Sequence, residues 1–186
     1  MNNYNLTIIL LILLSLIVIG IENTKINVHG ERLIPFHDYA SKIFFLYPEY
    51  WVLNKTAMDK NSIIEINVPY HFTKDDAIPY VQIIVENMTS SNESLHKVVN
   101  DNILEYNSSE PYIKNVTVDT NSKLGNYSAI EFEYEFKDNG TSMKAMELTS
   151  IIDNKTFYFD YVAGQRDYET IIPQIQKIIR SFEVNQ

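Results

Sequence analysis

Apolar and polar side chains alternate along most of the chain beyond residue 36, with the two-residue period of strands buried on one face. The alternation is clearest in residues 129–136, where Ile, Phe and Tyr alternate with Glu. Comparable patterns predict strands at residues 42–47, 62–68, 79–86, 112–118, 129–136, 142–152 and 156–162. Because residues 79–86 form a run rich in Val and Ile, we expect this strand to be buried on both faces.

Two segments follow the helical period instead. Ser94 is a good N-cap, and apolar residues follow it at helical spacing: Leu95, Val98, Val99, Ile103 and Tyr106. A second helix of about 15 residues is predicted near the C-terminus, with Ile171, Ile175, Ile178 and Phe182 on one stripe. Pro173 fits this helix if it lies in the first turn, where its missing N–H has no helical partner. The pattern predicts an α+β fold, an antiparallel β-sheet flanked by helices.

Two short turns are predicted to join the last three strands. Asn139 and Gly140 readily take the positive φ that a two-residue hairpin turn requires. Asp153 and Asn154 form a second candidate turn of the same length. Because loop length sets the register of a hairpin, two such turns would fix which side chains face each other across the three strands.

This register predicts two pairings between charged residues. It places Glu135 opposite Lys144, as an ordinary cross-strand ion pair. It also places Glu147 opposite both Phe132 and Asp160. Two facing carboxylates are unfavourable without a cation, a shared proton or a bulge, so a different register is the alternative explanation. If the register holds, Glu147 and Asp160 are the candidate site for a metal such as calcium or manganese. No other cofactor is predicted.

Two further acidic clusters could each bind a metal ion or could simply be exposed to solvent. The first is the strand ladder of Glu131, Glu133 and Glu135, which could join Glu147 or Asp160 around a hard cation. Its simpler interpretation is a solvated strand face with the aromatic row buried behind it. The second cluster is His71 with Asp75 and Asp76, which could bind a divalent metal or form an exposed acidic loop. The simpler interpretation is favoured for both clusters.

The N-terminal segment indicates export. Residues 6–21 carry no charge and are mostly Leu and Ile. They would span roughly 24 Å as a helix, which suits a signal-peptide core or a short membrane anchor. We therefore expect a signal peptide or N-terminal hydrophobic anchor helix over residues 1–21, a tether over 22–35 and the folded domain over 36–186. The predicted location is the cell surface, with the chain either secreted or held in the membrane by residues 6–21.

Glycosylation acceptors support the same location. Chance placement would give roughly two Asn-x-Ser/Thr sequons beyond residue 21, and the chain has many more. The acceptors are Asn54, Asn87, Asn92, Asn107, Asn115, Asn126, Asn139 and Asn154. Clustering of Asn, Ser and Thr in turns explains part of this excess. We interpret the remainder as a glycosylated external surface, since the motif has meaning only on exported chains.

Composition removes several classes of function. The 186-residue chain has no cysteine, which excludes disulfides, thiolate metal sites and a cysteine nucleophile. Its net charge of −9 argues against nucleic acid as a partner. Neither a G-x-S-x-G motif nor a Ser/His/Asp set is recognisable, although paired catalytic carboxylates cannot be read from sequence spacing. An enzyme is therefore not expected.

The chain also resembles a known family. The segment Phe44–Trp51 is similar to the opening strand and Y-P-x-x-W turn of PsbP-like domains. Residues Tyr158–Ala163, with the following helix closing in Ile178–Glu183, resemble the C-terminus of that family. The likeness covers roughly residues 36–184 and implies a sheet sandwiched between helices, the fold shared with a nuclear Ran-binding factor. Tyr47, Pro48 and Trp51 match the shared motif as residues that maintain the fold.

The resemblance implies a function without catalysis. Photosystem members of the family are extrinsic subunits that help retain calcium, manganese and chloride, whereas other relatives are exported domains of bacteria and archaea. The first hypothesis is an accessory subunit that binds an envelope or membrane protein. The alternatives are a module that binds a small ligand or a divalent cation, and an exported hydrolase on the same scaffold.

Overall fold

The computed structural model describes residues 32–54, 62–69, 73–75, 77–88, 93–109 and 113–185. The predicted signal or anchor helix over residues 1–21 and the acceptor Asn92 lie outside these described residues. Within the described ranges, no helix is both long enough and apolar enough to cross a membrane. The folded unit that contains the strands begins at Leu33.

Two helices and two antiparallel sheets make up this unit. The helices are α2 (Leu95–Ser109) and α3 (Tyr168–Ser181). The larger sheet has seven strands in the order β3-β4-β5-β9-β8-β7-β6. Its strands are β3 (Val52–Asn54), β4 (Ser62–Asn67), β5 (Tyr80–Asn87), β6 (Lys114–Leu124), β7 (Tyr127–Asp138), β8 (Thr141–Ile152) and β9 (Lys155–Gly164). These findings confirm the predicted α+β class, with an antiparallel sheet and two helices.

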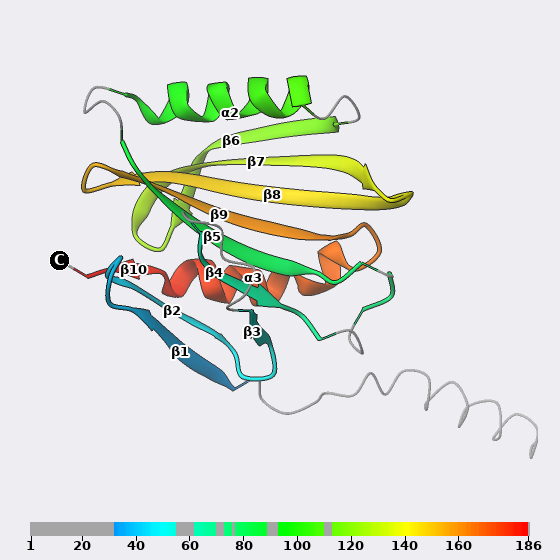
Figure 1. Cartoon of the computed structure of the whole chain (residues 1–186), viewed down its shortest axis with the longest axis horizontal. Coiled ribbons are helices and arrows are strands. Elements are labelled where there is room, and N and C mark those ends of the chain that lie inside the picture. Colours follow the sequence, from blue (N-terminus) through cyan, green and yellow to red (C-terminus); the bar gives the residue numbers. More distant parts are fainter. Residues whose placement is uncertain are drawn as a thin grey trace, which may run out of the picture. The chain divides into compact units, whose positions relative to one another are not determined.

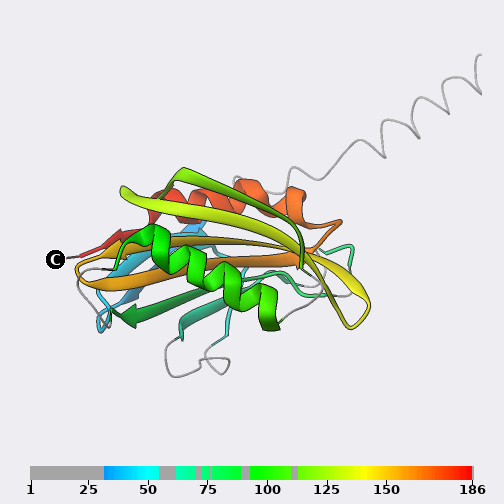
Figure 2. The same cartoon turned by 90° about the horizontal axis from the view of Figure 1, so that it is seen from above.

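The two helices cover opposite faces of the larger sheet (Figures 1 and 2). On one face, α3 buries Ile171, Ile175 and Ile178 against strand side chains such as Ile83 and Phe159. This contact forms the main hydrophobic core. On the other face, α2 packs against β7 and β8. The helix α2 therefore covers the part of this face that β7 and β8 form.

The smaller sheet was not predicted in full. It has the order β1-β2-β10, with β1 at Leu33–Asp38, β2 at Ile43–Pro48 and β10 at Glu183–Val184. Residues 33–35 thus belong to a paired strand and not to the tether expected over 22–35. Pairing with β2 lets Ile34 and Phe36 pack against the main core, which explains why the folded unit begins earlier than Phe36.

Both predicted two-residue turns are present. Asn139 and Gly140 have φ of 46° and 86°, and Asp153 and Asn154 have φ of 49° and 63°. All four residues occupy the left-handed region that such turns require. The register predicted for the three strands β7, β8 and β9 is therefore confirmed, pair by pair.

Two local predictions are wrong. Strand β5 is not buried on both faces: Val81 and Ile83 are buried against the α3 side, whereas Gln82 and Ile84 are half-buried on the α2 side. On this side, Ile84 lines an open pocket together with residues of α2. Pro173 lies in the second turn of α3, because the helix begins at Tyr168. Its ring points to solvent, so the missing N–H removes a bond from the exposed side of the helix.

Gly125 offers a test of how the β6–β7 turn docks against the end of α3. Its N–H donates to the carbonyl of Ile179 at 2.8 Å, and its φ is 61°. An added Cβ would lie 1.9 Å from the carbonyl oxygen of Phe182. We expect Gly125→Ala to lower the free energy of unfolding by roughly 2–4 kcal/mol, measured by urea denaturation.

Gly140→Ala is the matched control. Gly140 also has a positive φ, but nothing lies within 4 Å of an added Cβ. Only the backbone strain of about 1 kcal/mol should remain there. Equal losses in the two variants would show that the close approach to Phe182 has no energetic consequence.

Candidate functional site

The confirmed register brings two carboxylates together on the α2 face of the sheet. Glu147 on β8 pairs directly with Asp160 on β9. Directly opposite residues in an antiparallel pair project from the same face, so both side chains lie beside α2. They line a pocket of about 250 Å³ between the helix and the strands. The residues that line it are Ile84, Glu86, Asn102, Glu105, Tyr106, Glu147, Tyr158 and Asp160.

Glu147 is buried and well supplied with hydrogen bonds. Its side chain is only 3% exposed. Its Oε1 accepts from Thr149 Oγ1 at 2.8 Å and from Asn102 Nδ2 at 3.1 Å. Its Oε2 accepts a longer bond of 3.4 Å from the hydroxyl of Tyr106. Two of these three donors come from α2, so the helix holds this carboxylate in place.

Asp160 differs from Glu147 in this respect. Its Oδ1 is buried and accepts no hydrogen bond. Burying a polar atom without a partner costs free energy, so native structures rarely keep such an atom without a reason. Asp160 also lines the pocket, so a ligand bound there would lie beside this unsatisfied carboxylate.

The charges of the two carboxylates are coupled. Burial raises the pKa of Glu147, although its three hydrogen bonds act in the opposite direction. Burial, followed by the nearby charge of Glu147, raises the pKa of Asp160 well above its usual value. The pair therefore holds on to a proton at pH values where exposed carboxylates have lost theirs. Burial and the charge of Glu86 also raise the pKa of Tyr158 to about 12, so its hydroxyl stays protonated at neutral pH.

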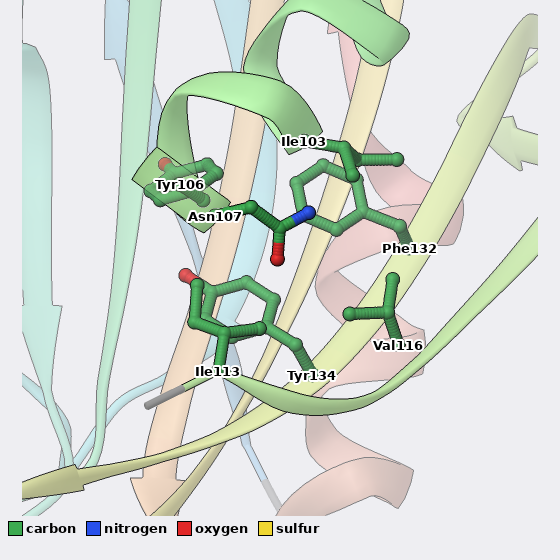
Figure 3. A pocket seen from close by; sticks show the side chains of 7 residues that line it. All are labelled: Ile103, Tyr106, Asn107, Ile113, Val116, Phe132 and Tyr134. Carbon is green, nitrogen blue, oxygen red and sulfur yellow. The ribbon is translucent and has the colours of Figure 1, made fainter. Parts of the chain in front are cut away.

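Tyr106 joins the pocket to an aromatic cluster. Its ring lies 6.0 Å from that of Phe132 and 5.5 Å from that of Tyr134, measured between centroids. Figure 3 shows these rings with Ile103, on the helix, around a second cavity of only about 10 Å³. This cavity is too small for anything larger than a water molecule. The cluster therefore acts as the closed wall that positions the Tyr106 hydroxyl over Glu147.

Sequence reasoning found the two carboxylates and missed the helical side of the site. Asn102 and Tyr106 follow Val98 at four-residue intervals, so all three share one helix face. Val98 is buried, and an Asn on the same stripe is a polar residue at a core-facing position. That interruption was the available sign that α2 faces a polar group.

The glutamate ladder on β7 has a different arrangement from the one expected. Glu135 does pair with Lys144 in register, but the Lys144 ammonium contacts Glu133 and Glu169 instead, each at 3.2 Å. It also lies 4.1 Å from the ring centroid of Tyr168. Packing against α3 draws the lysine away from Glu135. The ladder faces α3, so it does not join the Glu147–Asp160 pair.

The acidic loop around Asp75 is only partly described, since His71 and Asp76 lie outside the described residues. Asp75 is buried, so the expectation of an exposed loop is wrong for this residue. It forms an ion pair with Arg166, whose backbone N–H also donates to Asp75 Oδ2 at 3.0 Å. Burial raises the pKa of Asp75, but the bonds and charge of Arg166 outweigh it, so this pKa is lowered. We interpret this ion pair as structural.

The described part of the chain contains no group of three or more His, Asp or Glu side chains placed to hold a metal ion. Calcium or manganese at Glu147 and Asp160 stays a prediction.

The glycosylation acceptors have mixed environments. Asn54 is half-buried and donates to Glu65 Oε1 at 2.9 Å. The acceptors that are exposed are Asn87, Asn107, Asn115, Asn126, Asn139 and Asn154.

Comparison with known proteins supports the fold. No protein-family model matches the sequence, and no curated protein sequence matches it. Among solved structures, the chain is similar to LpqN of Mycobacterium tuberculosis, described as involved in cell envelope biogenesis. The identity is 14%, the coverage is 85% of this chain and 93% of LpqN, and the TM-score is 0.61.

Two further structures have the same fold. Cyanobacterial PsbP (CyanoP) from Synechocystis is 16% identical, with 86% of this chain and 96% of CyanoP covered at a TM-score of 0.52. The Ran-binding protein Mog1p of Saccharomyces cerevisiae is 7% identical, with coverage of 83% and 96% and a TM-score of 0.58. At such identities the likeness shows the fold, and it confirms the architecture implied by the PsbP-like resemblance.

The coupled carboxylates lead to a prediction about stability. Acids with a raised pKa in the folded state favour folding when protonated, so their penalty grows as pH rises through their unfolded-state pKa. Asp160→Asn removes one of the two charges and keeps the shape. We expect its unfolding midpoint to exceed that of the wild type by about 2–6 °C at pH 8, and the gain to shrink at pH 5. Calorimetry at both pH values measures this.

Glu169→Gln is the control for this experiment. It removes the same charge from an exposed position on the α3 side of the sheet. We expect a change of less than about 1 °C, with little dependence on pH. A destabilised Asp160→Asn at pH 8 would mean that the Asp160 charge has a favourable partner in the folded protein.

Proposed function

We propose that this chain is an exported, non-catalytic binding domain and that the pocket beside α2 is its recognition site. The observation that carries the proposal is the partnerless Oδ1 of Asp160, a residue that lines a pocket of about 250 Å³. A pocket that combines apolar walls with a few convergent polar groups is typical of ligand sites.

The solved structures with the same fold support a binding role. Mog1p is named a Ran-binding protein, and LpqN is described as involved in cell envelope biogenesis. We propose by analogy that this chain is a PsbP-like accessory subunit of an envelope or membrane protein. Export through residues 6–21 and glycosylation at the exposed acceptors belong to the same proposal.

A divalent-cation module is the second candidate. The facing carboxylates of Glu147 and Asp160 favour it, because a shared cation would relieve their repulsion. Calcium takes six to eight oxygen ligands, so such a site would draw most of them from water or from a partner.

Export is tested by the mass of the native protein. The full chain has a mass of 21.7 kDa. We expect protein from the native membrane or medium to be heavier than its polypeptide mass, and an N-glycosidase to remove the excess. Recovery of the unmodified full chain from the cytosol would contradict the proposal.

The pocket is tested by blocking it. We expect at least one of calcium, manganese, small amines, sugars or carboxylic acids to raise the unfolding midpoint of the wild type. A ligand at 100 times its Kd adds about 2.7 kcal/mol, or roughly 5–10 °C. Ile84→Trp should abolish this shift, because Ile84 lines the pocket. Ile78→Trp, at an exposed position that is not among the lining residues, should preserve it. Equal shifts in both variants would place binding elsewhere.

A further inference from the structure

The described residues that line the α2 pocket provide negative charge and no positive charge. Glu86, Glu105, Glu147 and Asp160 contribute carboxylates, and no Lys, Arg or His is among the lining residues. The lysines of α2 and β8 are engaged elsewhere. On α2, Lys97 pairs with Glu93 and Asp101, and on β8 Lys144 reaches the opposite face of the sheet.

The hydrogen bonds of the pocket define what is missing. An ionised carboxylate can only accept hydrogen bonds. Glu147 already accepts from three side-chain donors, whereas Asp160 Oδ1 accepts none. The group that would complete the site is therefore a donor at Asp160, and a positive charge on that donor would also offset the facing carboxylates.

An ammonium group meets this requirement better than a metal ion. A calcium ion needs six to eight oxygens, and the described residues do not gather three acidic or histidine side chains around one point. A primary ammonium needs few ligands, because it has three N–H donors and tolerates water in its shell. The rings of Tyr106 and Tyr158 also line the pocket, and aromatic faces attract cations.

We propose that the α2 pocket recognises a protonated primary amine, with the carboxylate of Asp160 as its main acceptor and Glu147 as the second negative charge. This inference rests on the proposed function, since it names the ligand chemistry of the same pocket. The amine is either a small free molecule or the Lys side chain of a partner protein. Both sources present the same alkylammonium group to a pocket of about 250 Å³.

Titration calorimetry of the full chain at pH 7.5 tests the proposal with four probes. Pentylamine represents the free amine, and 1-pentanol is its neutral counterpart of similar size. The peptide acetyl-Gly-Lys-Gly-amide represents a partner's side chain, and its Nζ-acetylated form is the neutral counterpart. We expect binding of pentylamine, of the lysine peptide or of both, and at least tenfold weaker binding of each neutral counterpart. The stronger amine identifies the source.

Two variants locate the interaction. Asp160→Asn keeps the shape of the pocket and should weaken amine binding at least tenfold. Glu169→Gln, which changes the net charge equally on the other side of the sheet, should change it less than twofold. Circular dichroism of both variants confirms folding. Amine binding that survives in Asp160→Asn, or is matched by the neutral probes, would overturn the proposal.

The remaining outcomes separate this proposal from the proposed function. Binding of calcium or manganese without amine binding would overturn ammonium recognition. If the Ile84→Trp variant then lost that metal binding, the pocket would still be a binding site. Binding of a neutral probe alone, lost in the same variant, would likewise overturn ammonium recognition and keep the pocket as a binding site. If no probe or metal binds and no compound gives a shift that Ile84→Trp removes, both proposals fail.

Discussion

The register of strands β7, β8 and β9 is the constraint on which the rest of this structure depends. It is set by two turns of two residues each, whose four members all have positive φ. Because side chains alternate with a period of two, a slip of one residue in β8 would move Glu147 to the α3 face and Leu148 to the α2 face. The main core would then contain a carboxylate, and the pocket would lose one. Turn geometry, core packing and the site are therefore one constraint.

Because of this register, the two faces of the larger sheet have different chemistry. The face under α3 is apolar and contains the large aromatic side chains that stabilise the fold. The α2 face can hold buried carboxylates because the other face already provides the burial of apolar surface that folding needs. The α2 helix supplies Asn102 and Tyr106 to the carboxylate of Glu147, whereas Oδ1 of Asp160 has no hydrogen-bond partner. The asymmetry between Glu147 and Asp160 is what distinguishes a prepared site from an ordinary buried pair.

Local sequence patterns predicted the elements that depend on local chemistry. The strands with clear alternation, the Ser94 cap and both turns follow from residue type and spacing, so they were recognisable. The features that depend on distant parts of the chain were not. Strand β10 has only two residues and pairs with β2 near the other end of the domain, and the Asp75–Arg166 ion pair joins residues 91 positions apart. The pocket beside β5 is also a tertiary feature, so the run of Val and Ile in that strand could not show that one of its faces is only half-buried.

The site shows the same division between local and distant information. The lengths of the two turns predicted that Glu147 faces Asp160, but not which groups surround the pair. Two of the three donors to Glu147 lie on a helix about 40 residues earlier in the chain, so no local pattern in the strands could identify them. That helix satisfies one carboxylate with neutral donors, and burial raises the pKa of both carboxyl groups, that of Asp160 also through the facing charge of Glu147. The proposed ammonium ligand would offset the repulsion between the facing carboxylates with a positive charge. The proposed ligand chemistry therefore follows from the donor that the described lining residues do not provide as much as from the carboxylates that they do.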